Sequence, residues 1–124
     1  MSDISLLPSD AAGKRITTKF ISVRNEETIG AIRSMLISKA KEFEVIDYLY
    51  VVDDERVLQG VISIKDVLQT ADNEIRVDTI MKRNPITVDS HADQERIIYL
   101  ILQHDLKSVP VVDKNKHLVG VIPY

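Results

Sequence analysis

The sequence contains no cysteine and no tryptophan, and aromatic residues make up only 5% of its 124 positions. Without cysteine there is no disulfide framework, no thiolate metal site and no cysteine nucleophile, and such usage suits a reducing cytoplasm. Apolar runs such as Val119–Ile122 are far shorter than the ~20 residues that span a bilayer as a helix. The opening residues Met1–Ile4 lack the basic region and apolar stretch of a signal peptide.

An excess of basic residues is also missing. Sixteen Lys and Arg stand against nineteen Asp and Glu, which gives a net charge of −3. Because binding to phosphate backbones requires a basic face, we expect no nucleic-acid partner. Hydrophobic residues make up 44% of the chain and charged residues 28%, which is typical of a chain with a packed core. The length fits one domain or two small, closely joined repeats.

An internal repeat organises the chain. Three segments of the first half recur in the second: Ile21–Val23 as Ile86–Val88, Tyr50–Asp53 as Pro110–Asp113, and Leu58–Ile62 as Leu118–Ile122. The first pair lies 65 positions apart and the other two pairs lie 60 apart. The first repeat therefore carries five extra residues, which we expect near 41–45, between its first helix and the next strand.

Each repeat predicts a strand, a helix and two further strands, and the first repeat adds a short closing helix. The helices are indicated by apolar residues at a 3.6-residue period, and each final pair of strands is joined by a polar turn. Thr28 or Glu27 is expected to cap the first helix, and Ser90 the second. Gly60 and Gly120 fall inside strands, which predicts a bulge or a close neighbour at each.

The predicted fold class is therefore α+β, a sandwich-like arrangement of two βαββα repeats related by a pseudo-two-fold axis. Residues 1–15 form a lead segment, 16–76 the first repeat and 77–124 the second. The second repeat stops at Tyr124, where its closing helix should begin. We expect that the natural chain continues past this point; the alternative is a natural end.

Two motifs of this doubled pattern resemble a pair of CBS domains, also called a Bateman module. They are Gly60–Asp66 and Ser108–Ile122, and the resemblance extends from Ile16 to the end. A narrower resemblance, to the MgtE-type magnesium transporters, is carried by Ala12–Phe20, Ile46–Asp53 and the Ala92–Glu95 segment with its following apolar helix.

The MgtE resemblance implies a regulatory module on the cytoplasmic side of the cell membrane. In that family the CBS pair connects an N-terminal helical domain to a transmembrane pore. The module would form a homodimer, have the transmembrane domain of its parent transporter as a partner, and bind Mg²⁺. The alternative is a stand-alone or differently fused CBS pair that senses an adenine nucleotide such as AMP, ADP or ATP.

Ser63 and Asp66 stand at the start of the short helix that closes the first repeat. Their spacing is that of a helix N-cap and the third helical residue, which is one complete explanation for them. A carboxylate at this turn can also accept hydrogen bonds from both hydroxyls of a ribose. The CBS resemblance implies this second role for Asp66, with Lys65 facing the phosphates, Tyr48 and Ile86 flanking the adenine, and Gly13 giving room nearby.

The MgtE resemblance also implies that carboxylates of the second repeat bind Mg²⁺, and Asp93 and Asp105 occupy such positions. Twelve residues along one helix span roughly 18 Å, so one ion cannot bridge the two within a chain. Each carboxylate also has a simpler explanation, as a charge at a helix end.

No catalytic constellation is apparent, and we expect no enzyme. The histidines at positions 91, 104 and 117 are scattered, without the spacing of a zinc site. Ser63 and Asp66 lack a neighbouring histidine and the glycines of a hydrolase elbow. A third possibility is a purely structural dimerisation module that binds neither nucleotide nor ion.

Overall fold

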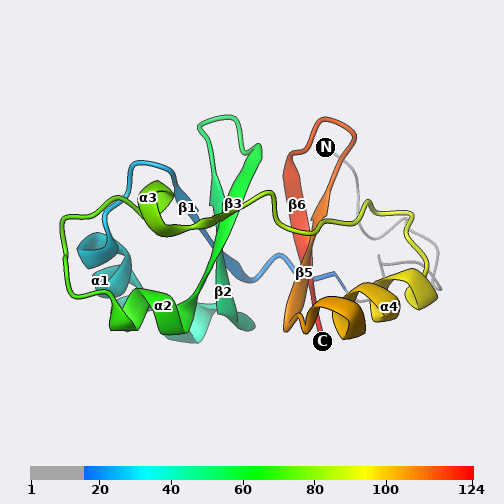
Figure 1. Ribbon diagram of the computed structural model, residues 1–124, viewed down its shortest axis with the longest axis horizontal. Coiled ribbons are helices and arrows are strands. Elements are labelled where there is room, and N and C mark those ends of the chain that lie inside the picture. The colour runs from blue at the N-terminus through cyan, green and yellow to red at the C-terminus, as the bar shows by residue number, and fades with distance from the viewer. Residues whose placement is uncertain (1–15) are drawn as a thin grey trace. The chain divides into compact units, whose positions relative to one another are not determined.

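The computed structural model describes residues 16–124, which form two compact units (Figure 1). The first unit consists of residues 19–85, and the second of residues 86–124 together with 16–18. In the first unit several helices pack against a small β-sheet, and in the described part of the second unit one helix does so. The mixed α+β class predicted from the sequence is confirmed.

A four-stranded sheet of order β1-β2-β3-β4 forms the centre of the first unit. Its strands are β1 (Phe20–Arg24), β2 (Val45–Val52), β3 (Leu58–Ser63) and β4 (Lys82–Arg83). β1 runs parallel to β2, and the other neighbours are antiparallel. The helical segments are α1 (Ile29–Lys39), the 3-10 turn η3 (Ala40–Glu42), α2 (Ile64–Gln69) and α3 (Val77–Ile80). The parallel pair is joined through α1, because parallel strands require a crossover connection.

The core of the first unit lies between this sheet and its helices. Ten apolar side chains form it, from β1, α1, β2, β3, α2, α3 and the residue after α3: Ile21, Val23, Ile29, Ile32, Leu49, Val51, Ile62, Val67, Val77 and Met81. α1 and α2 lie side by side in Figure 1 and contact each other. Val67 is completely buried, so the short helix α2 is fixed to the core mainly by this residue.

The second unit repeats the plan with fewer elements. The hairpin of β5 (Ser108–Val112) and β6 (Leu118–Pro123) packs against α4 (Gln94–His104). The predicted opening strand of this repeat is reduced to one parallel bridge between Val88 and Val111, where the first unit has a five-residue strand. The core consists of seven side chains: Val88, Ile97, Leu100, Ile101, Val109, Val111 and Ile122.

The leading residues of each sequence repeat belong to the unit that the rest of the other repeat forms. Thr17 pairs with Val121 through two backbone hydrogen bonds of 2.8 and 3.0 Å, in the second unit. Its counterpart 65 positions later, Lys82, pairs with Val61 in the first unit. The third residue of β3, Gly60, makes room for this exchange, because a Cβ there would lie 2.6 Å from the Met81 sulfur. The close neighbour predicted for this glycine is confirmed.

The predicted N-cap residue is confirmed for α1 and is wrong for α4. Thr28 caps α1 with its side chain, as one of the two alternatives proposed. At α4 the cap is Asp93 and not Ser90, because the helix begins at Gln94 and Asp93 Oδ1 accepts from the backbone N–H of Arg96 at 2.8 Å.

The extra residues of the first repeat lie where they were expected. Eight residues separate α1 from Tyr48, whereas three separate α4 from Ser108, the counterpart of Tyr48. The additional residues form η3 and extend β2 back to Val45, which pairs with Phe20.

Candidate functional site

The turn from β3 into α2 is the centre of the predicted ligand site. Ser63 is the last residue of β3 and has extended backbone angles, and its hydroxyl oxygen accepts from the backbone N–H of Asp66 at 3.0 Å. This is the N-cap geometry that the sequence predicts. The Asp66 side chain remains exposed and takes no part in that bond. The carboxylate is therefore available to a ligand while the backbone around it is held by the cap.

Tyr48 lies beside this turn. It is the direct cross-strand partner of Ser63 in the β2–β3 ladder. Its ring is half-buried and packs edge to face on Tyr50, with 6.4 Å between ring centroids. The structure therefore brings together four of the residues that the CBS resemblance implies for a nucleotide: Tyr48, Ser63, Lys65 and Asp66.

The two other implied nucleotide residues are placed differently. Ile86 belongs to the second unit, where it is half-buried and packs against that unit's core. Gly13 lies outside the described residues. Lys65, the second residue of α2, is exposed and carries the positive charge nearest to Asp66 in sequence.

Asp93 and Asp105 occupy opposite ends of α4, as the N-cap and the C-cap. Asp105 adopts the left-handed conformation (φ 53°, ψ 50°) that ends helices, and both side chains are exposed. Within residues 16–124, no three acidic or histidine side chains gather as a metal site would require.

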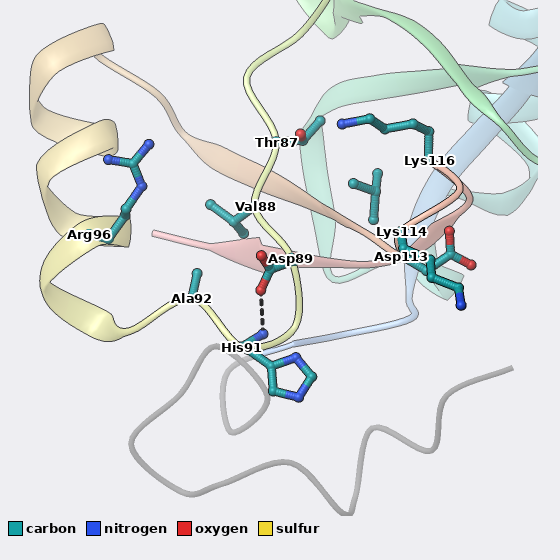
Figure 2. A pocket seen from close by; sticks show the side chains of 10 residues that line it. Thr87, Val88, Asp89, His91, Ala92, Arg96, Asp113, Lys114 and Lys116 are labelled. Carbon is teal, nitrogen blue, oxygen red and sulfur yellow. Dashed lines mark hydrogen bonds between the residues drawn. The ribbon is translucent and has the colours of Figure 1, made fainter.

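A cavity of about 470 Å³ lies between the N-terminal end of α4 and the β5–β6 turn. Figure 2 shows its lining, with Arg96 on α4 and two lysines, Lys114 and Lys116, in the turn. None of these three cations forms an ion pair with another described residue. Two other lining residues are joined to each other, because the backbone N–H of His91 donates to Asp89 Oδ1 at 2.7 Å.

In the first unit the corresponding surface is covered by residues 75–78. The backbone N–H of Val77 donates to the carbonyl of Glu27 at 2.8 Å, and that of Ile29 donates to the carbonyl of Ile75 at 2.9 Å. Glu27 is the counterpart of Ala92, which lines the cavity of the second unit. In the first unit, residues 75–78 cover this surface. In the second unit no described residue covers it, and the cavity lies there.

Among residues 16–124, two groups have shifted pKa values, and both lie away from the α2 turn. The backbone N–H of His117 donates to Asp113 and lowers the pKa of this carboxyl below its usual 3.8, with help from the imidazole and from Asn115. The Arg76 guanidinium donates to the Asp78 carboxylate at 2.7 Å, and this hydrogen bond raises the pKa of Arg76 above its ordinary value. Both shifts come mainly from local hydrogen bonds, and neither points to acid–base chemistry.

An apolar groove of about 200 Å³ lies on the helical side of the first unit. Its lining comes from β1, α1, η3, the start of β2 and α2: Ile21, Arg33, Leu36, Ile37, Ala40, Phe43, Ile46, Ile64 and Leu68. Ile37 is 80% exposed, Leu68 60% and Ile46 52%. The groove depends on η3 and on the extension of β2, which no helical periodicity in the sequence reveals.

Among residues 16–124, no helix is both long and apolar enough to cross a membrane.

The three histidines are separate: two are exposed, and the third, His117, pairs with Asp113 at 3.0 Å.

Comparison with known proteins gives these features a context. The CBS domain family matches residues 12–72 and 77–124, which is most of the chain. The magnesium transporter MgtE of Thermus thermophilus is 35% identical over 91% of this chain, and MgtE of Enterococcus faecalis is 35% identical over the same share. The chain spans about a quarter (25%) of the length of these curated relatives.

Solved structures agree with this match. The crystal structure of the cytosolic domain of the Mg²⁺ channel MgtE in complex with ATP is 33% identical, with a TM-score of 0.92, and the match covers 97% of this chain and 48% of that one. The CBSX2 protein in complex with AMP, at 23% identity and a TM-score of 0.78, shares the fold. The chain belongs to the CBS domain family and is a CBS pair similar to the cytosolic region of MgtE magnesium transporters.

Proposed function

We propose that this chain is the regulatory CBS pair of an MgtE-type magnesium transporter, on the cytoplasmic side of the membrane. In this role it binds an adenine nucleotide and Mg²⁺, and the bound state controls the pore of the full-length protein. The module carries out no catalysis. Ligand binding would shift the balance between arrangements of the module, as in other population-shift sensors.

The turn between β3 and α2 carries the nucleotide part of the proposal. Ser63 holds the backbone, the exposed Asp66 carboxylate can accept two ribose hydroxyls, and Tyr48 stands opposite Ser63 as an aromatic surface for a base. A similar cytosolic domain, 33% identical to this chain, has been crystallised with ATP. Adenine nucleotide is therefore the ligand class that this turn fits best.

Calorimetric titration of the chain with ATP and with AMP tests the nucleotide part. Asp66→Asn removes the charge and leaves the backbone N–H that bonds Ser63 in place. We expect about tenfold weaker ATP binding, since a hydrogen bond to a charged group contributes roughly 1.5–3 kcal/mol. Glu55→Gln is a matched control, because Glu55 lies in the turn at the opposite end of the β2–β3 ladder. Wild-type chain that binds neither nucleotide would refute this part.

The magnesium part rests on the MgtE relatives and on the exposed carboxylates of α4. Because Asp93 and Asp105 cap opposite ends of the helix, each would offer Mg²⁺ one carboxylate, and the ion would keep most of its waters. We therefore expect weak binding by the isolated chain, with further ligands from a second chain or from other parts of the transporter.

The apolar groove supports a homodimer, because exposed side chains such as Ile37 and Leu68 border a surface with almost no polar atoms. Analytical ultracentrifugation tests this directly. Ile37→Glu would place a charge in the contact and should shift the chain toward monomer without unfolding it, since Ile37 is 80% exposed. Leu102 on α4 is 67% exposed, and Leu102→Glu tests whether the second unit contributes to the contact.

A CBS pair fused to a different effector is the second candidate. It is favoured by matches to the choline transport ATP-binding protein OpuBA of Bacillus subtilis, 33% identical over 64% of this chain, and to the homoserine O-acetyltransferase of Methanococcus vannielii, 30% identical over 96%. The full-length reading frame separates the two candidates: long apolar spans after Tyr124 support the transporter, and an enzyme or ATPase domain supports the alternative.

A further inference from the structure

Arg33 is a half-buried arginine on α1 whose guanidinium contacts the far end of α2. Its Nη2 donates to the carbonyl of Thr70 at 2.6 Å and to the carbonyl of Val67 at 3.3 Å. Its Nη1 donates to the Asn73 side chain. The last carbonyls of a helix have no partner within the helix, so these bonds satisfy groups that would otherwise need water. A positive charge at this position also interacts favourably with the helix dipole.

The helix that Arg33 holds is short. α2 has only six residues, Ile64–Gln69, and a helix of this length does not persist by itself in water. Three contacts fix it in the folded protein: the Ser63 cap at its start, the buried Val67 in its middle and Arg33 at its end. The position of the Asp66 carboxylate, one residue before Val67, therefore depends on both ends of the helix.

The segment after α2 is held at the same place. The backbone N–H of Gly30 donates to the carbonyl of Asn73 at 3.0 Å, and a Cβ on Gly30 would lie 2.9 Å from the Asn73 Cβ. The N-terminal end of α1, the end of α2 and residues 70–76 thus meet around one guanidinium. The counterpart of Arg33 in the second repeat is Ile98, which is 41% exposed and cannot make these bonds.

We propose that Arg33 is a positioning residue for the nucleotide site: by holding the C-terminal end of α2, it fixes Ser63, Lys65 and Asp66 in the arrangement that receives the ligand. This role rests on the proposed function of the α2 turn. Arg33 itself touches the helix end and the following segment, and its effect on the ligand passes through α2.

Titration of the full 124-residue chain with ATP tests the role, with Arg33→Met and Arg33→Lys beside the wild type. Methionine keeps much of the aliphatic stem and removes every donor, so we expect an ATP Kd about tenfold higher, or roughly 1.4 kcal/mol. Lysine retains one charged group that can reach one carbonyl, and its Kd should lie between those of the wild type and Arg33→Met. Amide hydrogen exchange at Val67 and Thr70 should become faster in Arg33→Met than in the wild type.

A destabilised variant separates positioning from general loss of stability. Val109 is completely buried in the second unit, so Val109→Ala lowers stability without touching α2. We expect its ATP Kd to equal that of the wild type. An equal rise in Kd for Val109→Ala and Arg33→Met, or an unchanged Kd for Arg33→Met, overturns the positioning role while the proposed function stands. Absence of ATP binding by the wild type overturns the proposed function, and the positioning role falls with it.

Discussion

Asp93 has two possible roles, helix cap and magnesium ligand, and two substitutions separate them. Its Oδ1 accepts from the backbone N–H of Arg96 at 2.8 Å. Asp93→Ala removes the cap and the charge, whereas Asp93→Asn removes the charge and retains a side chain that caps equally well. Loss of the cap should cost about 1 kcal/mol of unfolding free energy, and for a chain of this size that lowers Tm by roughly 3–5 °C.

The first repeat supplies a matched control. Thr28 caps α1 in the same way, but its Oγ1 lies 3.3 Å from the backbone N–H of Ala31, and it carries no charge to interact with the helix dipole. Thr28→Ala should therefore cost less than Asp93→Ala. In urea denaturation without magnesium, we expect Asp93→Asn to stay within about 0.5 kcal/mol of the wild type. A loss as large as that of Asp93→Ala would show that the cap is not what Asp93 contributes.

Thermal unfolding with added MgCl₂ then isolates the metal role. An ion that binds only the folded chain stabilises it by about 1.4 kcal/mol at ten times its Kd. If Asp93 binds Mg²⁺, the wild type and Thr28→Ala should gain stability on addition of MgCl₂, and Asp93→Asn should gain much less. An equal gain in all three variants would refute a role for this carboxylate in magnesium binding.

Two further predictions concern stability. Gly60→Ala should lower the free energy of unfolding by about 1–3 kcal/mol in urea denaturation, because the new Cβ would lie 2.6 Å from the Met81 sulfur and 2.8 Å from the Lys82 carbonyl oxygen. An unchanged urea midpoint would show that β4 can move away from residue 60 at no cost in stability. The pKa of Asp113 is lower in the folded chain than in the unfolded chain, so as pH falls Asp113 is protonated first in the unfolded chain. The stabilisation that this carboxylate contributes is therefore complete above pH 3.8 and is lost as pH falls through the pKa of the folded chain. The stability difference between the wild type and Asp113→Asn should therefore shrink below pH 3.8, and a difference that is constant with pH would contradict this reasoning.

The features predicted correctly from the sequence are those set by neighbouring residues. The strand pairs, their polar turns and the Ser63 cap follow from apolar periodicity and from side chains that bond their own local backbone. Comparing offsets of 65 and 60 residues also located the extra residues before Tyr48. The resemblance of the motifs to CBS domains indicated the family, and the match over residues 12–72 and 77–124 confirms it. The roles of the individual site residues stay predictions.

Tertiary structure alone decided the long-range pairings. Thr17 joins the second unit and Lys82 the first, which no local pattern predicts, because the pairing depends on which sheet edge each segment reaches after folding. The prediction of Ser90 as the α4 cap is wrong because several polar residues precede the helix, and only the packing of the folded helix selects Asp93. Arg33 is an unremarkable polar residue in a helical pattern, and its importance appears only when folding brings the end of α2 within reach of its guanidinium.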